Sequence, residues 1–265
     1  MAKYIPLTKE DLQVFIQDET ICLGDIDTSL ITDMSRLFFN SKREDFSGIE
    51  TWDVSNVQNM SYMFAGAKNF NKPLNNWDVS NVTDMSWMFA DAKKFNQNIS
   101  SWNVSNVKNI SHMFTCAAKF NQPLETWDVS NVTNMEALFA YAKSFNQSIG
   151  GWNIGHVTNM AFMFSGAEKF NQDISNWDVS KVYDMACMFF YATNFNQDIS
   201  DWNISSVEHM SGMFNGAKNF NQPISKWNMS NVKKISYMFY KAKSFNQDIS
   251  NWDLSNVIEM DHVYK

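Results

Sequence analysis

Length, composition and charge exclude several classes of protein before any motif is considered. The chain has 265 residues, of which 45% are hydrophobic and 18% charged, a composition typical of a folded protein with a sizeable core. Its formal net charge of −7 disfavours general binding to nucleic acid or to an anionic membrane. Three cysteines are too few for a disulfide framework. The 10 Trp, 22 Phe and 17 Met are unusual and require an explanation.

The first 26 residues predict an N-terminal cap made of a helix and a strand. Thr8 to Asp11 resembles a capping box, and the helix that follows places Leu12, Phe15 and Ile16 on its inner face. Residues 21–23 predict the strand. A cap of this kind covers the first open face of a repeat array.

From residue 27 onward the chain is an array with a period of 25 residues. The tryptophans of the array are Trp52, Trp77, Trp102, Trp127, Trp152, Trp177, Trp202, Trp227 and Trp252, with Trp87 outside the series. A fixed period of this size predicts a solenoid, so residues 27–265 form one elongated domain of about ten units. The first unit is irregular and the last is incomplete.

Recurring positions account for the unusual composition. Counting each repeat Trp as position 0, Val recurs at +5, Met at +8 and +11, Phe at +12 and +18, and Ala at +15. These positions predict the core. Asn follows the second Phe of every unit, from Asn71 to Asn246. This Asn ladder either bonds backbone groups of the turns or binds a ligand.

Each unit predicts one short strand and one short helix, which makes the fold class α/β. Trp102 and Val104 alternate with a polar residue, as in a strand. From Val107 the apolar residues follow steps of three and four, as on one face of a short helix. Stacked strands would form a single parallel sheet, which is the arrangement of a leucine-rich-repeat solenoid.

The repeat motif resembles a known family. The unit F-N-Q-x-I-S-x-W-D/N-V-S-N-V-x-N-M-x-x-M-F-x-x-A-K resembles the BspA-like leucine-rich repeat of bacterial and protist surface proteins. The resemblance covers about nine-tenths of the chain. It implies a leucine-rich-repeat solenoid and a role in adhesion or protein interaction, with host matrix or cell-surface proteins as partners. It also implies a cell-surface or secreted location, whereas the start Met-Ala-Lys-Tyr-Ile-Pro shows no signal peptide and leaves a cytoplasmic location open.

Catalytic and metal-binding motifs are missing from the sequence. His112, His156, His209 and His262 lie in different units, and the three cysteines are also far apart. No phosphate-binding glycine loop, HExxH, G-x-S-x-G or zinc spacing is present. We therefore expect no enzyme activity, no cofactor and no metal site.

Two rows of side chains are the candidate binding surfaces. The Asp/Asn row follows each repeat Trp on the predicted sheet face: Asp53, Asp78, Asn103, Asp128, Asn153, Asp178 and Asn203. The aromatic row lies at +10 on the predicted outer helix face; its candidates are Tyr62, Trp87, Phe162 and Tyr237. Each row has a plainer interpretation. The first would be a soluble strand face whose short polar side chains hold the turn into the helix, and the second would be packing between adjoining units.

These observations predict a non-enzymatic binding protein that recognises a macromolecule through a rigid solenoid. The alternative is a carbohydrate-binding module that uses the Asp/Asn row. A Lys row at +16 and +17 either compensates helix C-termini or contacts an anionic glycan. The last unit, near Trp252 to Leu254, offers an edge through which an end-to-end homodimer could form. No transmembrane span and no nucleic-acid partner are expected.

Overall fold

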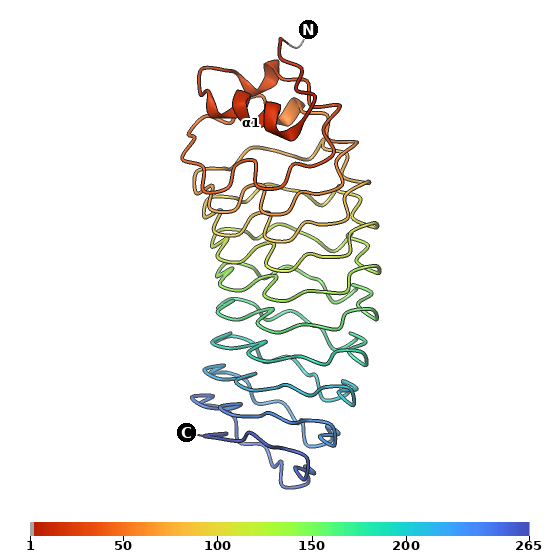
Figure 1. The fold of residues 1–265 in the computed structure, drawn as a ribbon. Coiled ribbons are helices and arrows are strands. Elements are labelled where there is room, and N and C mark those ends of the chain that lie inside the picture. The colour runs from red at the N-terminus through yellow and green to blue at the C-terminus, as the bar shows by residue number, and fades with distance from the viewer. Residues whose placement is uncertain (1–2, 265) are drawn as a thin grey trace.

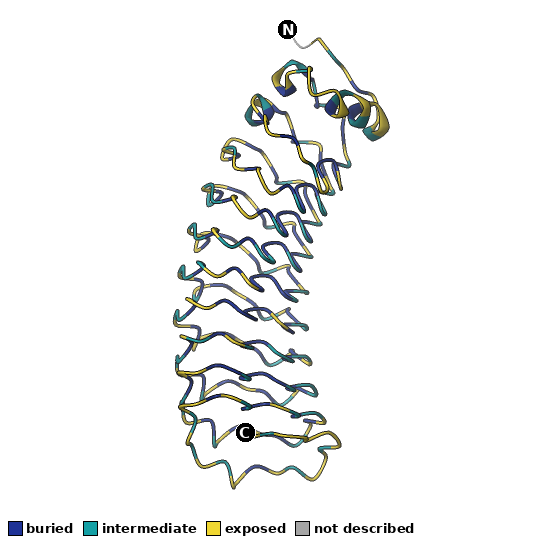
Figure 2. Cartoon of the chain, turned by 90° about the vertical axis from the view of Figure 1, so that its left-hand side faces the viewer, coloured by how far each residue is buried: buried dark blue, intermediate teal, exposed yellow. Residues whose placement is uncertain are grey.

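The computed structural model describes residues 3–264, which form an elongated stack of coils, one per repeat (Figure 1). The N-terminal segment lies at one end of the stack and the C-terminal repeat at the other. Buried residues fill the inside of the coils and exposed residues occupy their edges, and the stack bends along its length (Figure 2). The predicted repeat solenoid is therefore confirmed at the level of its overall architecture.

The N-terminal segment contains the α-helix that the sequence predicts. Helix α1 spans Lys9–Gln17, and its N-cap Thr8 exchanges two hydrogen bonds with Asp11, each 3.1 Å long. Leu12 and Ile16 of this helix are buried against the core, and Phe15 is half-buried. The strand predicted at residues 21–23 is absent: a short 3-10 helix, η1 (Leu23–Asp25), occupies the end of this segment.

The cap is attached to the array by backbone pairing and by one buried cation. The Tyr4 carbonyl accepts the amide of Asp27, the first residue of the array, at 2.9 Å. The guanidinium of Arg43 is buried and donates to the carbonyls of Ile16 and Ile21 at 3.0 and 2.9 Å. A second 3-10 helix, η2 (Ile49–Thr51), then leads into the first repeat Trp.

Pairing between coils does not occur where the sequence predicts a strand. Parallel bridges run from Asp33 of the irregular first unit through one residue in every later repeat, seven positions after the Trp: Asn59, Asp84, Asn109, Asn134, Asn159, Asp184, His209, Lys234 and Glu259. The Trp segment instead closes turns within its own repeat, as when the Trp102 amide donates to the Ile99 carbonyl at 3.1 Å. The prediction of a Trp-centred strand is wrong, and no extended strand forms within residues 3–264.

The predicted helix of each repeat is also wrong, because the segment is a series of overlapping turns. In the repeat of Trp52, the amides of Met60, Tyr62, Phe64 and Gly66 donate to carbonyls of the next repeat, whereas those of Met63, Ala65 and Ala67 donate to the carbonyl three residues back. A helix would direct every amide along its own segment. Amides that point alternately to the next repeat and back along their own segment require a left-handed backbone at intervals, with φ of 58° at Tyr62 and 73° at Gly66.

Columns of aromatic rings fill the core. Phe64 stacks on Phe70 of its own repeat at 3.8 Å and on Phe89 of the next repeat at 5.6 Å, and the pattern continues along the array. These rings are fully buried, and burial of one such side chain is worth about 1.5–3 kcal/mol. Each repeat Trp also donates its indole N–H across the interface; Trp127 reaches the Ile99 carbonyl at 3.1 Å. The positions predicted as core are therefore core, except near the C-terminal end of the array, where Met260 at +8 is 54% exposed.

The Asn ladder is structural. The Oδ1 of Asn121 accepts the backbone amide of Asn146 at 2.9 Å and the side-chain amide of Gln147 at 3.1 Å. The same bond recurs from repeat to repeat. These oxygens are occupied by the neighbouring coil, which confirms the interpretation that they satisfy backbone groups between turns.

Candidate functional site

The Asp/Asn row lies at an edge of the coils and is occupied locally. The Oδ1 atoms of Asp78, Asp128 and Asp178 each accept the backbone amide two residues further on, at 3.0 Å. Asn103, Asn153 and Asn203 make the same turn with bonds of 3.2–3.3 Å, and so does Asp53 at 3.0 Å. The row is exposed. It does not form a sheet face, because the coils pair seven positions after the Trp.

These turns also keep the carboxylates ionised. The hydroxyl and the backbone amide of Ser80 hold the pKa of Asp78 below its usual range. Ser130 and Ser180 do the same for the pKa of Asp128 and of Asp178. One oxygen of each carboxylate is thus used within the turn and the other faces solvent. The row can accept hydrogen bonds, and its first role is to shape the turn.

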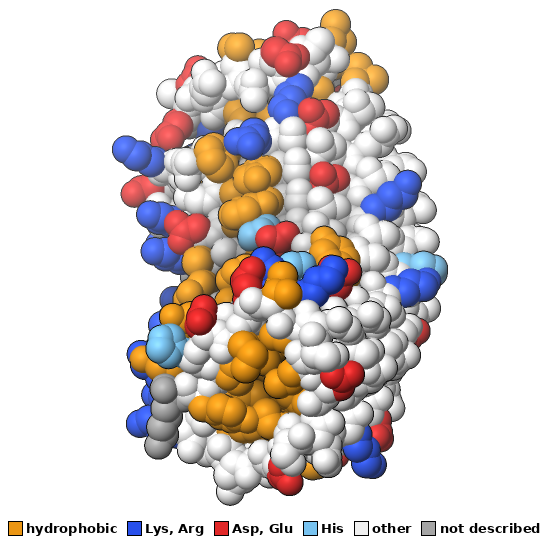
Figure 3. Space-filling model, turned by 60° about the horizontal axis from the view of Figure 1, so that its bottom comes forward, with side chains coloured by type: hydrophobic (Ala, Val, Ile, Leu, Met, Phe, Trp, Pro, Cys, Tyr) orange, Lys and Arg blue, Asp and Glu red, His pale blue; other side chains and the backbone are white. Residues whose placement is uncertain are grey.

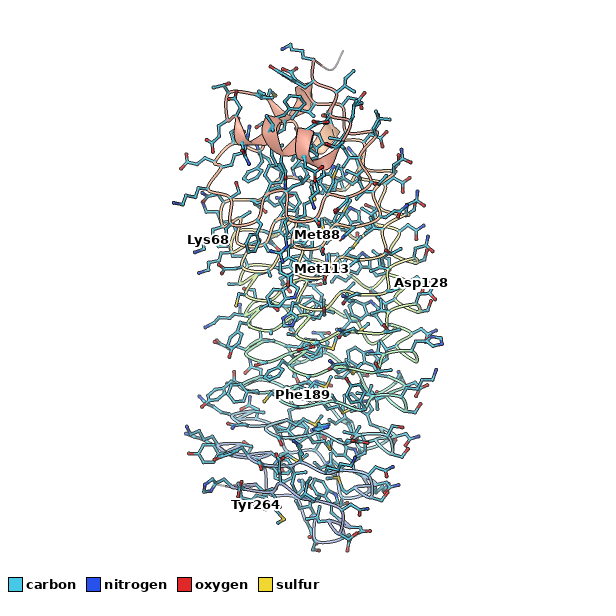
Figure 4. The ribbon with its side chains drawn as sticks, viewed as in Figure 1. Lys68, Met88, Met113, Asp128, Phe189 and Tyr264 are labelled. Carbon is cyan, nitrogen blue, oxygen red and sulfur yellow. The ribbon has the colours of Figure 1, made fainter. Side chains whose placement is uncertain are left out.

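The Lys row lies on the opposite edge of the array from the Asp/Asn row. Figure 4 shows Lys68 and Asp128 pointing away from the stack on opposite sides, with Met88, Met113 and Phe189 between them. Part of the Lys row is paired: Lys143 Nζ lies 2.8 Å from Glu168, and Lys68 lies 3.8 Å from Asp91. The solenoid therefore has an acidic edge and a basic edge, and the basic edge is partly neutralised by nearby carboxylates.

The aromatic row occupies the left-handed positions of the turn segment. It comprises Tyr62, Trp87, His112, Ala137, Phe162, Cys187, Gly212, Tyr237 and His262, all of which have φ between 48° and 65°. Glycine adopts this conformation at Gly212. For other residues the left-handed backbone costs about 1–2 kcal/mol. Most repeats nevertheless place a bulky side chain here, so the side chain contributes something that glycine would not.

In the first half of the row the side chains stack on one another. The Arg36 guanidinium lies 4.3 Å from the Tyr62 ring, Tyr62 stacks on Trp87 at 5.3 Å, and Trp87 stacks on His112 at 3.8 Å. Hydrophobic side chains form a column along this face, followed by a histidine and an acidic side chain (Figure 3). Packing between units, the plainer interpretation of this row, therefore holds for Tyr62 and Trp87.

The stack stops at Ala137, where the surface is hollowed. A cavity of about 370 Å³ opens there; its lining is Trp87, His112, Thr115, Glu136, Ala137, Ala140, Tyr141, Phe162, Ser165, Cys187 and Phe190. Ala137 and Ala140 are buried on its floor, whereas the Phe162 ring is 42% exposed. The structure thus brings two predicted residues, Trp87 and Phe162, to one site. We call this site the Ala137 hollow.

The polar groups of the Ala137 hollow are few. His112 Nε2 lies 3.7 Å from the Glu136 carboxylate, and burial lowers the pKa of the imidazole despite that carboxylate. Burial raises the pKa of the Cys187 thiol to about 11, so the thiol stays protonated at neutral pH. Thr115 donates its hydroxyl to the Ala137 carbonyl at 2.7 Å. The site presents rings, a neutral imidazole and one carboxylate, a set that favours binding over nucleophilic chemistry.

Tyr237 lies three repeats beyond Phe162 and outside the Ala137 hollow. Its ring is 41% exposed and contacts Tyr240 at 5.7 Å and His262 at 5.2 Å. Glu136, Thr115 and the two alanines of the hollow are not among the predicted site residues. The sequence signal that could have found them is Ala137, a small residue that follows three rings of the row, Tyr62, Trp87 and His112.

The remaining histidines and cysteines do not converge. His156 stands where most repeats have Asn, and its Nδ1 lies 2.9 Å from the Ser130 carbonyl, the contact that Asn131 makes with Ser105 at 2.8 Å. Across residues 3–264, no three His, Cys, Asp or Glu side chains are grouped closely enough to hold a metal ion. The same part of the chain has no helix with the length and apolarity needed to span a bilayer.

Comparison with known proteins gives one family match. The family described as "Mycoplasma protein of unknown function, DUF285" matches residues 12–127, 109–211 and 173–265. No curated protein matches the chain. Among solved structures, an internalin of Listeria monocytogenes is similar at 13% identity over 95% of this chain and 82% of its own, with a TM-score of 0.25. A score of that size supports no argument about fold or function.

Proposed function

The chain belongs to the family of Mycoplasma proteins of unknown function DUF285, and we propose that it is a non-enzymatic binding protein whose solenoid recognises a protein partner. Its repeat motif resembles the BspA-like leucine-rich repeat, so we propose an adhesion or interaction role at the cell surface or after secretion. Host matrix and cell-surface proteins are the partner class that this resemblance suggests.

One observation carries the proposal: the aromatic row retains exposed rings on a strained backbone. Phe162 and Tyr237 are more than two-fifths exposed, at φ of 59° and 60°. Neither ring stacks face to face with another ring of residues 3–264, unlike Tyr62 and Trp87. Large aromatic side chains that are partly exposed and held rigidly are the usual anchors of protein interfaces. The row therefore fits a protein partner better than the Asp/Asn row does.

Carbohydrate binding through the Asp/Asn row is the second candidate function. The observation in its favour is that Asp78, Asp128 and Asp178 are ionised, exposed and repeated at equal intervals. A regular line of acceptors could bind the hydroxyl groups of a linear glycan. Each Oδ1 already accepts a hydrogen bond within its turn, so part of the acceptor capacity of every residue is used before such a ligand binds.

Binding to immobilised matrix proteins and to a glycan array distinguishes the two. The variant Trp87→Ala/Phe162→Ala removes two rings. The variant Asp78→Asn/Asp128→Asn/Asp178→Asn removes three charges and keeps the turns, because Asn103 makes the same turn. We expect the first variant to weaken protein binding at least about tenfold and the second to leave it unchanged. If only the Asn variant loses binding, the Asp/Asn row is the binding site and the aromatic row is not.

Self-association is a separate proposal for the C-terminal repeat. Ile258, Met260 and Tyr264 are each more than half exposed there, beside a hollow of about 620 Å³. Figure 3 shows the apolar patch that results at this end. We propose that two copies associate through it end to end. Light scattering on the purified chain and on Ile258→Asp/Met260→Asp tests this; a monomeric wild-type chain would refute it.

A further inference from the structure

The aromatic row contains a vacancy of the size of one ring. Rings of neighbouring repeats in this row lie 5.3 Å apart at Tyr62–Trp87 and 3.8 Å apart at Trp87–His112. Ala137 then replaces a ring, and the next ring is Phe162. Coils rise about 4.8 Å each, so His112 and Phe162 belong to coils about 10 Å apart. A ring between them would lie about 5 Å from each, which is within the range of aromatic contacts.

The space beside Ala137 is open, whereas the space beside Gly212, the glycine of the row, is filled. At Gly212 a Cβ atom would lie only 2.9 Å from Cys187 Sγ, so the neighbouring repeat fills that space. At Ala137 the space is the 370 Å³ hollow described above. Its walls come from the two rings of the stack on one side and from Phe162 and Phe190 on the other. The floor is apolar, formed by Ala137 and Ala140.

A charge at the rim defines the ligand further. The Glu136 carboxylate accepts the Asn159 amide at 3.1 Å and lies 3.7 Å from His112. Burial lowers the pKa of His112, so the imidazole is neutral at neutral pH and does not balance the carboxylate. No Lys or Arg of residues 3–264 forms an ion pair with Glu136. An apolar ring site beside one uncompensated carboxylate is complementary to a ring beside a cation.

We propose that the Ala137 hollow binds an aromatic side chain of a protein partner, with an adjacent Lys or Arg of that partner on Glu136. The inserted ring completes the interrupted stack between His112 and Phe162. This inference rests on the proposed function and assigns its anchor. A sugar ring is the competing occupant, because it also stacks on aromatic faces. The uncompensated carboxylate favours the cationic peptide.

A peptide assay tests the proposal without a native partner. The probes are the fluorescently labelled peptides Gly-Ser-Lys-Trp-Ser-Gly and Gly-Ser-Lys-Leu-Ser-Gly, titrated with the full chain. We expect the Trp peptide to bind about tenfold more tightly than the Leu peptide, as for a buried aromatic anchor. Equal binding of the two peptides overturns the proposal. So does preferential binding of a neutral oligosaccharide that the Trp peptide does not displace.

The decisive variant fills the vacancy. Ala137→Phe supplies the missing ring from the protein itself, and Phe162 shows that this backbone position accepts Phe, with φ of 59° against 50° at Ala137. We expect Ala137→Phe to abolish Trp-peptide binding while the circular dichroism spectrum stays unchanged. The matched control Tyr183→Ala removes an exposed ring that lies outside the aromatic row and outside the hollow, and it should leave binding unchanged. Binding that survives in Ala137→Phe overturns the proposal.

A charge variant keeps the test valid if Ala137→Phe folds poorly. Glu136→Gln retains the shape of the side chain and removes its charge. It should weaken binding of the Lys-Trp peptide severalfold and leave binding of a Gln-Trp peptide unchanged. Equal effects on the two peptides count against the assignment of the partner's cation to Glu136. If matrix proteins bind the chain equally well with and without Ala137→Phe, the proposed function stands and the hollow is not its anchor. If the Trp peptide binds selectively but no protein partner does, the hollow stands and the proposed function fails.

Discussion

Removing one rung of the Asn ladder should destabilise the array locally. In Asn121→Ala the backbone amide of Asn146 and the side-chain amide of Gln147 lose their shared acceptor. Asn121 is half-buried, so water replaces part of what is lost. A lost hydrogen bond of this kind costs about 0.5–1.5 kcal/mol, so two give about 1–3 kcal/mol. For a chain of this size, that corresponds to a fall in melting temperature of roughly 2–12 °C.

Hydrogen exchange measures the effect at the site. The amide of Asn146 should exchange faster in Asn121→Ala, whereas the amide of Asn171, which donates to Asn146, should change less. Urea denaturation gives the accompanying change in the free energy of unfolding. The control is Asn121→Asp, which keeps an acceptor at Oδ1 and should retain more protection of Asn146 than the Ala variant does.

Two results would refute this reasoning. The first is a urea midpoint and an Asn146 exchange rate in Asn121→Ala equal to those of the wild-type chain. The second is that Asn121→Asp exposes Asn146 as much as Asn121→Ala does, because an acceptor at that position would then be irrelevant. Either result would return the Asn ladder to the list of candidate ligand sites.

Three further predictions concern the core, the turns and the hollow. Trp127→Phe removes one of the two donors to the buried Ile99 carbonyl, the other being the Trp102 amide, and should cost about 0.5–1.5 kcal/mol in urea denaturation; an unchanged midpoint contradicts the contribution of this bond. Turn serines hold the pKa of Asp78, Asp128 and Asp178 below the ordinary 3.8. The turn hydrogen bonds therefore stabilise the folded chain fully above that pH, and this stabilisation is lost as the pH falls through the lowered pKa values. The urea midpoint should therefore drop below about pH 4, and less so in the triple Asn variant; equal pH profiles contradict this. Cys187, with a pKa raised to about 11, should react with iodoacetamide at neutral pH far more slowly than exposed Cys22; mass spectrometry of the labelled peptides shows whether it does.

The candidate site shows where prediction from the sequence succeeds and where it stops. Trp87 and Phe162 are predicted from their position outside the core register, and the structure places both at the Ala137 hollow. Glu136 and Thr115 are not predicted, although Glu136 stands where most repeats have Ser or Ala. Both matter because Ala137, next to Glu136 and one coil beyond Thr115, stands where several other coils have a ring. A cavity between repeats depends on several coils at once.

The sequence by itself determines the period, the core positions, the Asn ladder and the capped helix α1. Each of these depends on residues that recur in register or on a local hydrogen bond, as between Thr8 and Asp11. Only the tertiary structure decides the backbone path between Val57 and Ala67. Apolar steps of three and four suit both a helix and a series of overlapping turns. The choice is made by the neighbouring coil, which accepts every second amide and thereby forces the left-handed positions that carry the aromatic row.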